Sequence, residues 1–195
     1  LIIGTRPDCV DDEILKLLKE LSRQCYLSVE FGIESCYDKT LKRINRGHTF
    51  REAADAVKIT SELGIKTGAH FIFGLPGESL SEMLDEADII SALPLTTVKF
   101  HQLQIIKGTA IENEYRINTS DFHLFTWEEY LEFIISFLER FNPEIIVERF
   151  TGEAPPEFLT ERLWENKRTD QIVPLVEKRL EELDTWQGRL YERKK

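Results

Sequence analysis

Apolar and polar residues alternate along residues 26–34, so that this stretch has two distinct faces. One side of the extended chain carries only apolar side chains, those of Leu27, Val29, Phe31 and Ile33. The other side carries small and acidic residues, namely Ser28, Glu30, Gly32 and Glu34. A buried strand of an α/β protein is usually apolar on both faces. The pattern therefore predicts a strand of a barrel or half-barrel whose interior holds a polar ligand.

The remaining segments alternate between short apolar runs and runs of helical periodicity. Strands are predicted at residues 1–5, 26–34, 65–73, 97–106 and 145–150. Helices are predicted at residues 12–22, 38–45, 49–63, 79–93, 110–115, 126–141 and 170–183. Three helix starts show a capping box, a hydroxyl residue followed three positions later by a glutamate: Thr49 and Glu52, Ser79 and Glu82, and Thr126 and Glu129.

Helical crossovers between successive strands predict parallel βαβ units. We therefore expect an α/β fold, a partial (β/α) TIM-like barrel with parallel strands, whose chemistry lies at the carboxyl ends of the strands. The Pro155–Pro156 pair closes this part. Residues 1–155 are thus predicted to form the barrel domain and residues 156–195 a helical C-terminal extension. The apolar stripe of the extension could pack against the outside of the barrel or against a partner.

Every predicted strand ends in polar residues. In chain order these are Arg6 and Asp8, Glu30 and Glu34, His70, then Lys99, His101, Gln102, Gln104 and Lys107, and finally Glu148 and Arg149. Because the carboxyl ends of parallel strands meet at one edge of the sheet, polar groups on all of them indicate a ligand-lined interior. Glu30 and Glu34 could form an acid–base pair, or each could pair with a cation such as Lys99 or Arg149.

The histidines and cysteines do not form a metal-binding motif. His70 and His101 lack a fixed metal-ligand spacing, so we interpret them as hydrogen-bonded barrel histidines. The cysteines Cys9, Cys25 and Cys36 are separated by 16 and 11 residues and are interpreted as buried or incidental thiols. We therefore assign no metal ligand in this sequence.

Composition is that of an ordinary globular domain of 195 residues, and the net charge of −10 argues against generic binding to a nucleic-acid backbone. The basic residues of segment 39–48 could contact nucleic acid, although a solvated helix face is the favoured interpretation. No apolar run approaches the ~20 residues of a membrane span. The cysteine usage fits a reducing, cytoplasmic setting. The chain opens on strand-like residues without a Met, so we expect it to be a piece of a longer protein.

Three segments, in order, resemble the core of radical S-adenosylmethionine (SAM) enzymes. They are Val29-Glu30-Phe31-Gly32-Ile33-Glu34-Ser35, Asn45-Arg46-Gly47-His48-Thr49 and Phe71-Ile72-Phe73-Gly74-Leu75-Pro76-Gly77-Glu78. The most similar pattern is that of the branch shared by oxygen-independent coproporphyrinogen oxidase and the radical domain of the elongator-type tRNA-modifying enzymes. Segments 4–8, 99–109, 149–152 and 163–167 are most similar to the YhcC-like proteins, and the resemblance covers nearly the whole chain.

The resemblance implies a role for each matching position. Glu34 corresponds to the residue near the SAM ribose, and Arg46 corresponds to the arginine that binds the SAM carboxylate. The backbone segments expected to line the adenine are those of Phe73, Gly74, Ile105 and Ile106. The side chains expected to face the substrate are those of Glu30, His70, His101 and Arg149.

Two features depart from the family pattern. Gly4 stands where some relatives place a glutamate that binds the SAM amino group. The CxxxCxxC loop, whose three thiolates hold a 4Fe–4S cluster in the family, is absent from the sequence. We therefore expect the C-terminal part of a radical SAM core, which lacks the cluster ligands and does not cleave SAM by itself.

The resemblance implies that the parent protein is an iron–sulfur oxidoreductase. Its cluster, reduced by a protein such as flavodoxin or ferredoxin, would reductively cleave SAM to a 5′-deoxyadenosyl radical that abstracts a hydrogen atom from the substrate. The substrate is unknown: a tRNA base, a metabolite and a protein side chain all stay open, and the net charge leans away from tRNA.

Two other functions remain open from the residues alone. A barrel lyase or aldolase could bind a substrate phosphate at the turn of residues 74–79 and form a Schiff base on Lys99 or Lys107. A non-catalytic binding module could use the helical extension as a docking surface.

Overall fold

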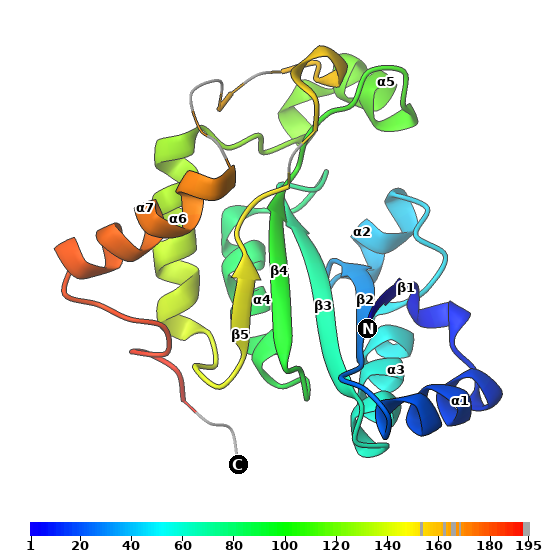
Figure 1. The fold of residues 1–195 in the computed structure, drawn as a ribbon. Coiled ribbons are helices and arrows are strands. Elements are labelled where there is room, and N and C mark those ends of the chain that lie inside the picture. Colours follow the sequence, from blue (N-terminus) through cyan, green and yellow to red (C-terminus); the bar gives the residue numbers. More distant parts are fainter. Residues whose placement is uncertain (153, 162, 165–166, 168, 193–195) are drawn as a thin grey trace.

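The computed structural model describes residues 1–152, 154–161, 163–164, 167 and 169–192, and Figure 1 shows their arrangement. Five parallel strands form one sheet in the order β1-β2-β3-β4-β5. Their bounds are β1 Ile2–Thr5, β2 Ser28–Glu34, β3 Lys66–Phe73, β4 Thr97–Gln102 and β5 Ile146–Arg149. Glu165 and Asn166, which belong to the segment 163–167 singled out in the sequence, lie outside the described residues.

Of the seven α-helices in the described residues, the first six connect successive strands and the last follows β5. They are α1 Asp12–Ser22, α2 Asp38–Arg43, α3 Phe50–Glu62, α4 Leu80–Ser91, α5 Ala110–Ile117, α6 Trp127–Arg140 and α7 Thr169–Glu182. All three predicted capping boxes are present, at the starts of α3, α4 and α6. In each, the hydroxyl accepts from a backbone N–H and the glutamate accepts in return, so the helix starts where the sequence predicts.

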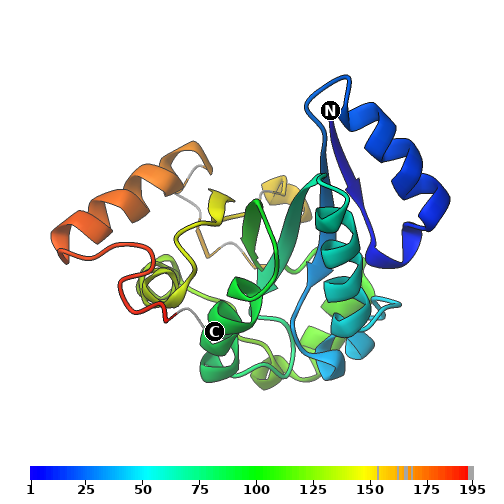
Figure 2. The ribbon, with the colours of Figure 1, turned by 90° about the horizontal axis from the view of Figure 1, so that it is seen from below.

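Helices α3, α4 and α6 lie along one face of the sheet, as the view from below in Figure 2 shows. The apolar side of β2 packs on this face, where Val29, Phe31 and Ile33 are fully buried. Edge-on and stacked aromatic rings continue the core between the sheet and α6: Phe73, Phe100, Phe133 and Phe137. The helices therefore cover the apolar face of β2, and its acidic face points into the interior of the partial barrel.

The parallel sheet and its helical crossovers confirm the predicted α/β partial barrel. Each strand is shorter than predicted, and the largest difference is at β4, which ends at Gln102 and not at residue 106. Leu103 still donates from its N–H to the Phe73 carbonyl oxygen at 2.8 Å, but Ile106 pairs in antiparallel orientation with Leu159. The chain therefore leaves the sheet after Gln102 and forms a loop at the carboxyl end of β4.

The C-terminal helix α7 packs against α6, which is one of the two arrangements that the sequence left open. Ile172 and Val176 are each 1% exposed and belong to the same apolar core as the sheet. Val173 and Leu183 stay exposed on the other side of the helix and beyond its end. In the part of the chain that the structure describes, no helix has the length and apolar character needed to cross a bilayer.

Candidate functional site

The acidic face of β2 has room for its side chains because a glycine lies beside it. Glu30 pairs in register with Gly68 on β3. A Cβ atom added at Gly68 would lie 3.0 Å from Glu30 Cγ and 2.8 Å from Thr97 Oγ1. Glycine at this position therefore leaves space for the Glu30 side chain, which is buried against the sheet.

Arg46 returns to the end of β2 and forms an ion pair with Glu34. Arg46 Nη2 lies 2.9 Å from Glu34 Oε1. The same guanidinium donates to the carbonyl oxygen of Gly32, from Nη2 at 2.6 Å and from Nε at 3.2 Å. Neither Arg46 Nη1 nor Glu34 Oε2 has a hydrogen-bond partner among the described residues, so each of these atoms is free to contact a ligand.

Glu34 occupies a strained position in the backbone. Its φ angle is +78°, in the left-handed region that residues other than glycine rarely adopt. A register shift between Gly32 and Glu34 accompanies this conformation. Strain of this kind costs about 1–3 kcal/mol and concentrates at ligand-binding sites. Burial raises the pKa of the Glu34 carboxyl, and the nearby Arg46 only partly offsets this effect.

Glu30 lies in a network of charges on the interior face. Lys99 Nζ lies 2.6 Å from both Glu30 oxygens and 3.3 Å from Glu148 Oε2, and His70 Nε2 lies 3.0 Å from Glu30 Oε2. Burial acts to raise the pKa of Glu30, but the hydrogen bonds from Lys99 and His70 outweigh it, so the pKa lies below its usual value. The structure thus places Glu30 in an ion pair with Lys99, the second of the two interpretations of this residue.

His101 on β4 stacks against His70, with 5.7 Å between the ring centroids. Burial, together with the positive charges of His70, Arg149 and Lys99, lowers the pKa of His101 to about 4. The imidazole is therefore neutral at pH 7. Gly152 packs against this ring, since an added Cβ would lie 2.5 Å from His101 Nδ1.

A cavity of about 350 Å³ lies at the carboxyl ends of strands β2 to β5. The predicted site residues that line it are Glu34, His70, His101, Ile106 and Arg149. Arg46 contacts this group through Glu34, and Glu30 contacts it through His70. The structure therefore brings together most of the residues predicted to contact SAM or substrate, although it does not assign roles to them.

The other residues predicted to line the adenine lie elsewhere. The Phe73 side chain is buried in the aromatic core, and its carbonyl oxygen accepts from Leu103. Gly74 donates from its N–H to Met83 Sδ at 3.0 Å, and its Cα faces the carbonyl oxygen of His123. Neither Phe73 nor Gly74 lines the 350 Å³ cavity. Ile105 lines a second cavity beside it. Their predicted contacts with adenine stay predictions.

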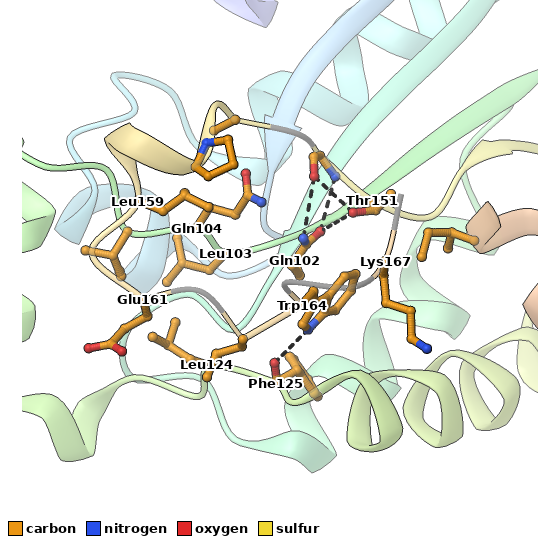
Figure 3. Close-up of a pocket in the computed structure, with 16 residues that line it drawn as sticks. Gln102, Leu103, Gln104, Leu124, Phe125, Thr151, Leu159, Glu161, Trp164 and Lys167 are labelled. Atoms are coloured by element: carbon orange, nitrogen blue, oxygen red, sulfur yellow. Dashed lines mark hydrogen bonds between the residues drawn. The ribbon is translucent and has the colours of Figure 1, made fainter. Parts of the chain in front are cut away.

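The neighbouring cavity, of about 480 Å³, was not predicted from the sequence (Figure 3). It lies between the loop after β4, the segment that precedes α6, and the segment after β5. Gln102, Leu103, Gln104 and Gly152 line both cavities, so the two adjoin. No local sequence pattern indicates this cavity, because its wall is built by contacts between distant segments. Trp164, for example, is held at the wall by a hydrogen bond from its Nε1 to the Phe125 carbonyl oxygen at 2.9 Å.

Two buried glutamates were also missed. Glu86 on α4 is fully buried and accepts a hydrogen bond from the Cys36 N–H at 2.7 Å, while Glu78 accepts one from the Ser35 hydroxyl at 2.5 Å. Burial raises the pKa of both carboxyls. These glutamates hold the turn between β2 and α2, and that helix leads to Arg46. The sequence feature that could have identified Glu86 as buried is its position in the apolar stripe of α4, between Met83 and Ile90.

Most backbone donors in the turn of residues 74–79 are already bonded within the protein. The N–H groups of Gly77 and Glu78 donate to the Asp121 and Leu75 carbonyl oxygens, and that of Ser79 donates to Glu82. An anion would therefore meet donors that are already satisfied and a glutamate side chain nearby.

The basic residues of segment 39–48 are largely paired with carboxylates. Lys39 pairs with Glu82 at 2.5 Å, and Arg43 pairs with both Glu114 and Asp121. Arg46 adds its pair with Glu34. These pairs reduce the positive charge that this segment presents to a nucleic acid.

Comparison with known families identifies the class of protein. Residues 1–90 match the radical SAM superfamily, and residues 95–182 match the Radical_SAM C-terminal domain. The chain belongs to the radical SAM superfamily.

Within this superfamily the chain is similar to several curated proteins. It is 31% identical over 191 residues to the uncharacterized protein YtqA of Bacillus subtilis, covering 98% of this chain and 58% of YtqA. It is 34% identical over 177 residues to the protein YhcC of Escherichia coli, covering 88% of this chain and 56% of YhcC. The chain thus spans about half the length of these curated relatives.

Solved structures confirm the fold. The archaeal Elp3 of Methanocaldococcus infernus superimposes with a TM-score of 0.79 at 23% identity, over 96% of this chain and 42% of Elp3. Coproporphyrinogen III oxidase of Escherichia coli, a radical SAM enzyme, superimposes with a TM-score of 0.55 at 16% identity, over 70% of this chain and 31% of the oxidase. At these identities the likeness concerns the partial barrel and not the substrate.

Proposed function

We propose that this chain forms the SAM-binding and substrate-facing wall of a radical SAM enzyme. Membership of the superfamily supports the class of cofactor. The observation on which the proposal rests is the Glu34–Arg46 ion pair beside the 350 Å³ cavity at the carboxyl ends of the strands. Active sites of parallel α/β barrels lie at this edge.

The residues at this edge fit the polar parts of SAM. Arg46 Nη1 would donate to the SAM carboxylate, and Glu34 Oε2 would accept from a ribose hydroxyl. Because Arg46 already uses Nε and Nη2 on the Gly32 carbonyl, its contact with the carboxylate would be through one nitrogen, and not through the two of the usual Arg–carboxylate pair. Ile106, which lines the cavity, would contribute an apolar contact to the adenine.

The residues of this chain do not fit a 4Fe–4S cluster. Cys36 is buried, and Cys9 and Cys25 are exposed at separate places in the fold. The described residues contain no group of three or more histidine, cysteine or acidic side chains that could hold a metal ion. Under our proposal the cluster is bound by residues outside these 195, and no step of cluster chemistry belongs to this chain.

The interior residues of this chain would position the substrate. SAM on a reduced cluster supplies a radical that abstracts hydrogen. Beside the substrate, the Glu30–Lys99 ion pair would hold two charges that neutralise each other below the cavity. The neutral His101 imidazole could accept a hydrogen bond from the substrate or donate one to it. The stacked rings of His70 and His101 would also restrict the entry of water from the side of the sheet.

The alternative of a lyase or aldolase finds less support. Its phosphate site, the turn of residues 74–79, has most of its backbone donors satisfied. Of its two candidate lysines, Lys99 is held by the Glu30 carboxylate, and Lys107 donates to the Glu157 carbonyl oxygen outside the 350 Å³ cavity. A Schiff base needs a free neutral amine, which an ion-paired lysine does not provide.

The alternative of a non-catalytic module also finds less support, because residues expected to form its docking surface are buried. The apolar residues Ile172 and Val176 of the extension are buried in the core of this chain and are not available as a docking surface.

The experiment that tests the proposal uses the full-length gene product, reconstituted anaerobically with iron and sulfide. Under reduction with SAM we expect formation of 5′-deoxyadenosine, and we expect Arg46→Gln to lower this product at least tenfold at a fixed, subsaturating SAM concentration. Arg51→Gln is the matched control, because Arg51 is 91% exposed on α3. If the full-length protein assembles a cluster but forms no 5′-deoxyadenosine, the proposal is wrong.

A further inference from the structure

The two adjoining cavities differ in the polar groups that they offer to a ligand. In the 480 Å³ cavity several polar groups are already bonded within the protein (Figure 3). Gln102 Oε1 accepts from Thr151 Oγ1 at 2.8 Å and from the Gly152 N–H at 3.2 Å. The Trp164 Nε1–H donates to the Phe125 carbonyl oxygen. Beside these groups, the cavity wall carries the apolar side chains of Leu103, Ile105, Leu124 and Phe125, which suit the apolar body of a ligand.

The Lys167 ammonium group also lines the larger cavity, but it is engaged there. It lies 5.5 Å from the ring centroid of Trp127, within the range of a cation–π contact. An anionic group of a ligand would therefore compete with this contact.

The unbonded polar groups lie in the smaller cavity and at the boundary between the two. Gln104 lines both cavities, and its amide has no hydrogen-bond partner among the described residues. Arg149 lines the smaller cavity and forms neither an ion pair nor a hydrogen bond within the described part of the chain. His101 Nε2 is buried and likewise lacks a partner.

Arg149 is exposed to solvent at the smaller cavity, and its guanidinium has no carboxylate partner among the described residues. Lys99 is bonded to both oxygens of Glu30 and lies 3.3 Å from Glu148. Arg46 is paired with Glu34. Among the residues that line the smaller cavity, Arg149 is thus the cationic side chain without a carboxylate partner. A guanidinium binds carboxylates and phosphates through two parallel hydrogen bonds, so an anionic ligand group is its natural complement.

We propose that the two cavities form one substrate site, in which the larger cavity holds an apolar body and Arg149 binds a carboxylate or phosphate group of the substrate. Gln104, at the boundary, would hydrogen-bond to the part of the substrate that links the two. This inference rests on the proposed function, because it places the substrate beside the SAM that Glu34 and Arg46 would bind. It names the substrate class as an apolar molecule or side group with an acidic end.

Three ring-shaped probes test the inference by saturation-transfer NMR and competition in the presence of saturating SAM. They are indole-3-acetate, its neutral isostere indole-3-acetamide, and phenyl phosphate. We expect at least one of the two anions to bind at least tenfold more tightly than the amide, and the better anion identifies the acidic group. In Arg149→Gln this preference should disappear, while the affinity for SAM changes less than threefold.

Two further variants separate the parts of the site. Ala154→Phe adds a ring in the larger cavity and should weaken the anions and the amide alike. Arg51→Gln, on the exposed face of α3, should leave all affinities unchanged. Equal binding of acid and amide, or a preference that survives Arg149→Gln, would overturn the inference. A probe preference without any SAM binding would contradict the proposed function and leave the anion site standing, so the two failures can be told apart.

Discussion

The carbonyl oxygen of Gly32 accepts two hydrogen bonds from the Arg46 guanidinium, and the lack of a side chain at Gly32 is what allows this contact. A Cβ atom at this position would lie 2.3 Å from Arg46 Nη2 and 2.7 Å from Glu34 Oε1. One glycine therefore determines where both charged residues lie.

Gly32→Ala should displace the Glu34–Arg46 pair without removing any charged group. We expect the affinity for SAM to fall at least tenfold, with the far-ultraviolet circular dichroism of the wild type retained. Arg51→Gln, on the exposed face of α3, is the control and should bind SAM as the wild type does. Isothermal titration calorimetry measures both variants, and equal SAM affinity of Gly32→Ala and wild type would contradict the predicted role of the pair.

The local features of the fold could be predicted because they depend on neighbouring residues. The boxes at Thr49, Ser79 and Thr126 each place their helix start within a four-residue pattern. The burial of Val29 and the inward position of Glu30 follow from alternation along one strand. These features need no information about the rest of the chain.

His101 should remain neutral well below the usual pKa of histidine. Its pKa is lowered to about 4 in the folded protein, chiefly by burial and further by the positive charges of His70, Arg149 and Lys99. Between pH 6.5 and about 4 the unfolded chain therefore binds a proton that the folded protein does not, so this residue makes stability fall as the pH falls.

We expect His101→Asn to lose less stability than wild type between pH 7 and pH 5, measured by urea denaturation at both values. The comparison of two proteins cancels the opposite contribution of carboxyls whose pKa is raised. The ring proton resonances of His101 should show no titration midpoint above pH 5, and a midpoint near 6.5 would refute the assignment.

The Glu30–Lys99 pair should contribute strongly to stability. Lys99→Met leaves a buried carboxylate with only His70 beside it, and we expect the free energy of unfolding to fall by about 3 kcal/mol. The double variant Glu30→Gln with Lys99→Met should recover most of this loss, because no charge is then left unpaired. Lys58→Met, which removes an exposed pair with Glu62, should change stability by less than about 0.5 kcal/mol. A similar effect of Lys58→Met and Lys99→Met in chemical denaturation would contradict this account.

The larger cavity could not be predicted because it depends on contacts between distant segments. Residues 103–106 are again largely apolar, which extended the predicted strand, but their alternation is out of phase with that of Val98 and Phe100. In the structure Ile106 pairs with Leu159 outside the sheet. The ring of Trp164 reaches the cavity through a bond to Phe125 that no local pattern signals. Glu34 was singled out by the alternation along its strand, but its place beside Arg46 in one ligand site was predicted only from the family resemblance, which joins two segments that composition and periodicity leave separate.

Calorimetric titration of SAM into the full-length protein and its Arg46→Gln variant tests the central claim most directly. The account predicts one SAM per chain in the wild type, with an affinity at least tenfold weaker in Arg46→Gln and unchanged in Arg51→Gln. SAM binding that is the same in all three proteins, or no SAM binding to a wild-type protein that holds its cluster, would contradict the assignment of Glu34 and Arg46 as the SAM-binding pair.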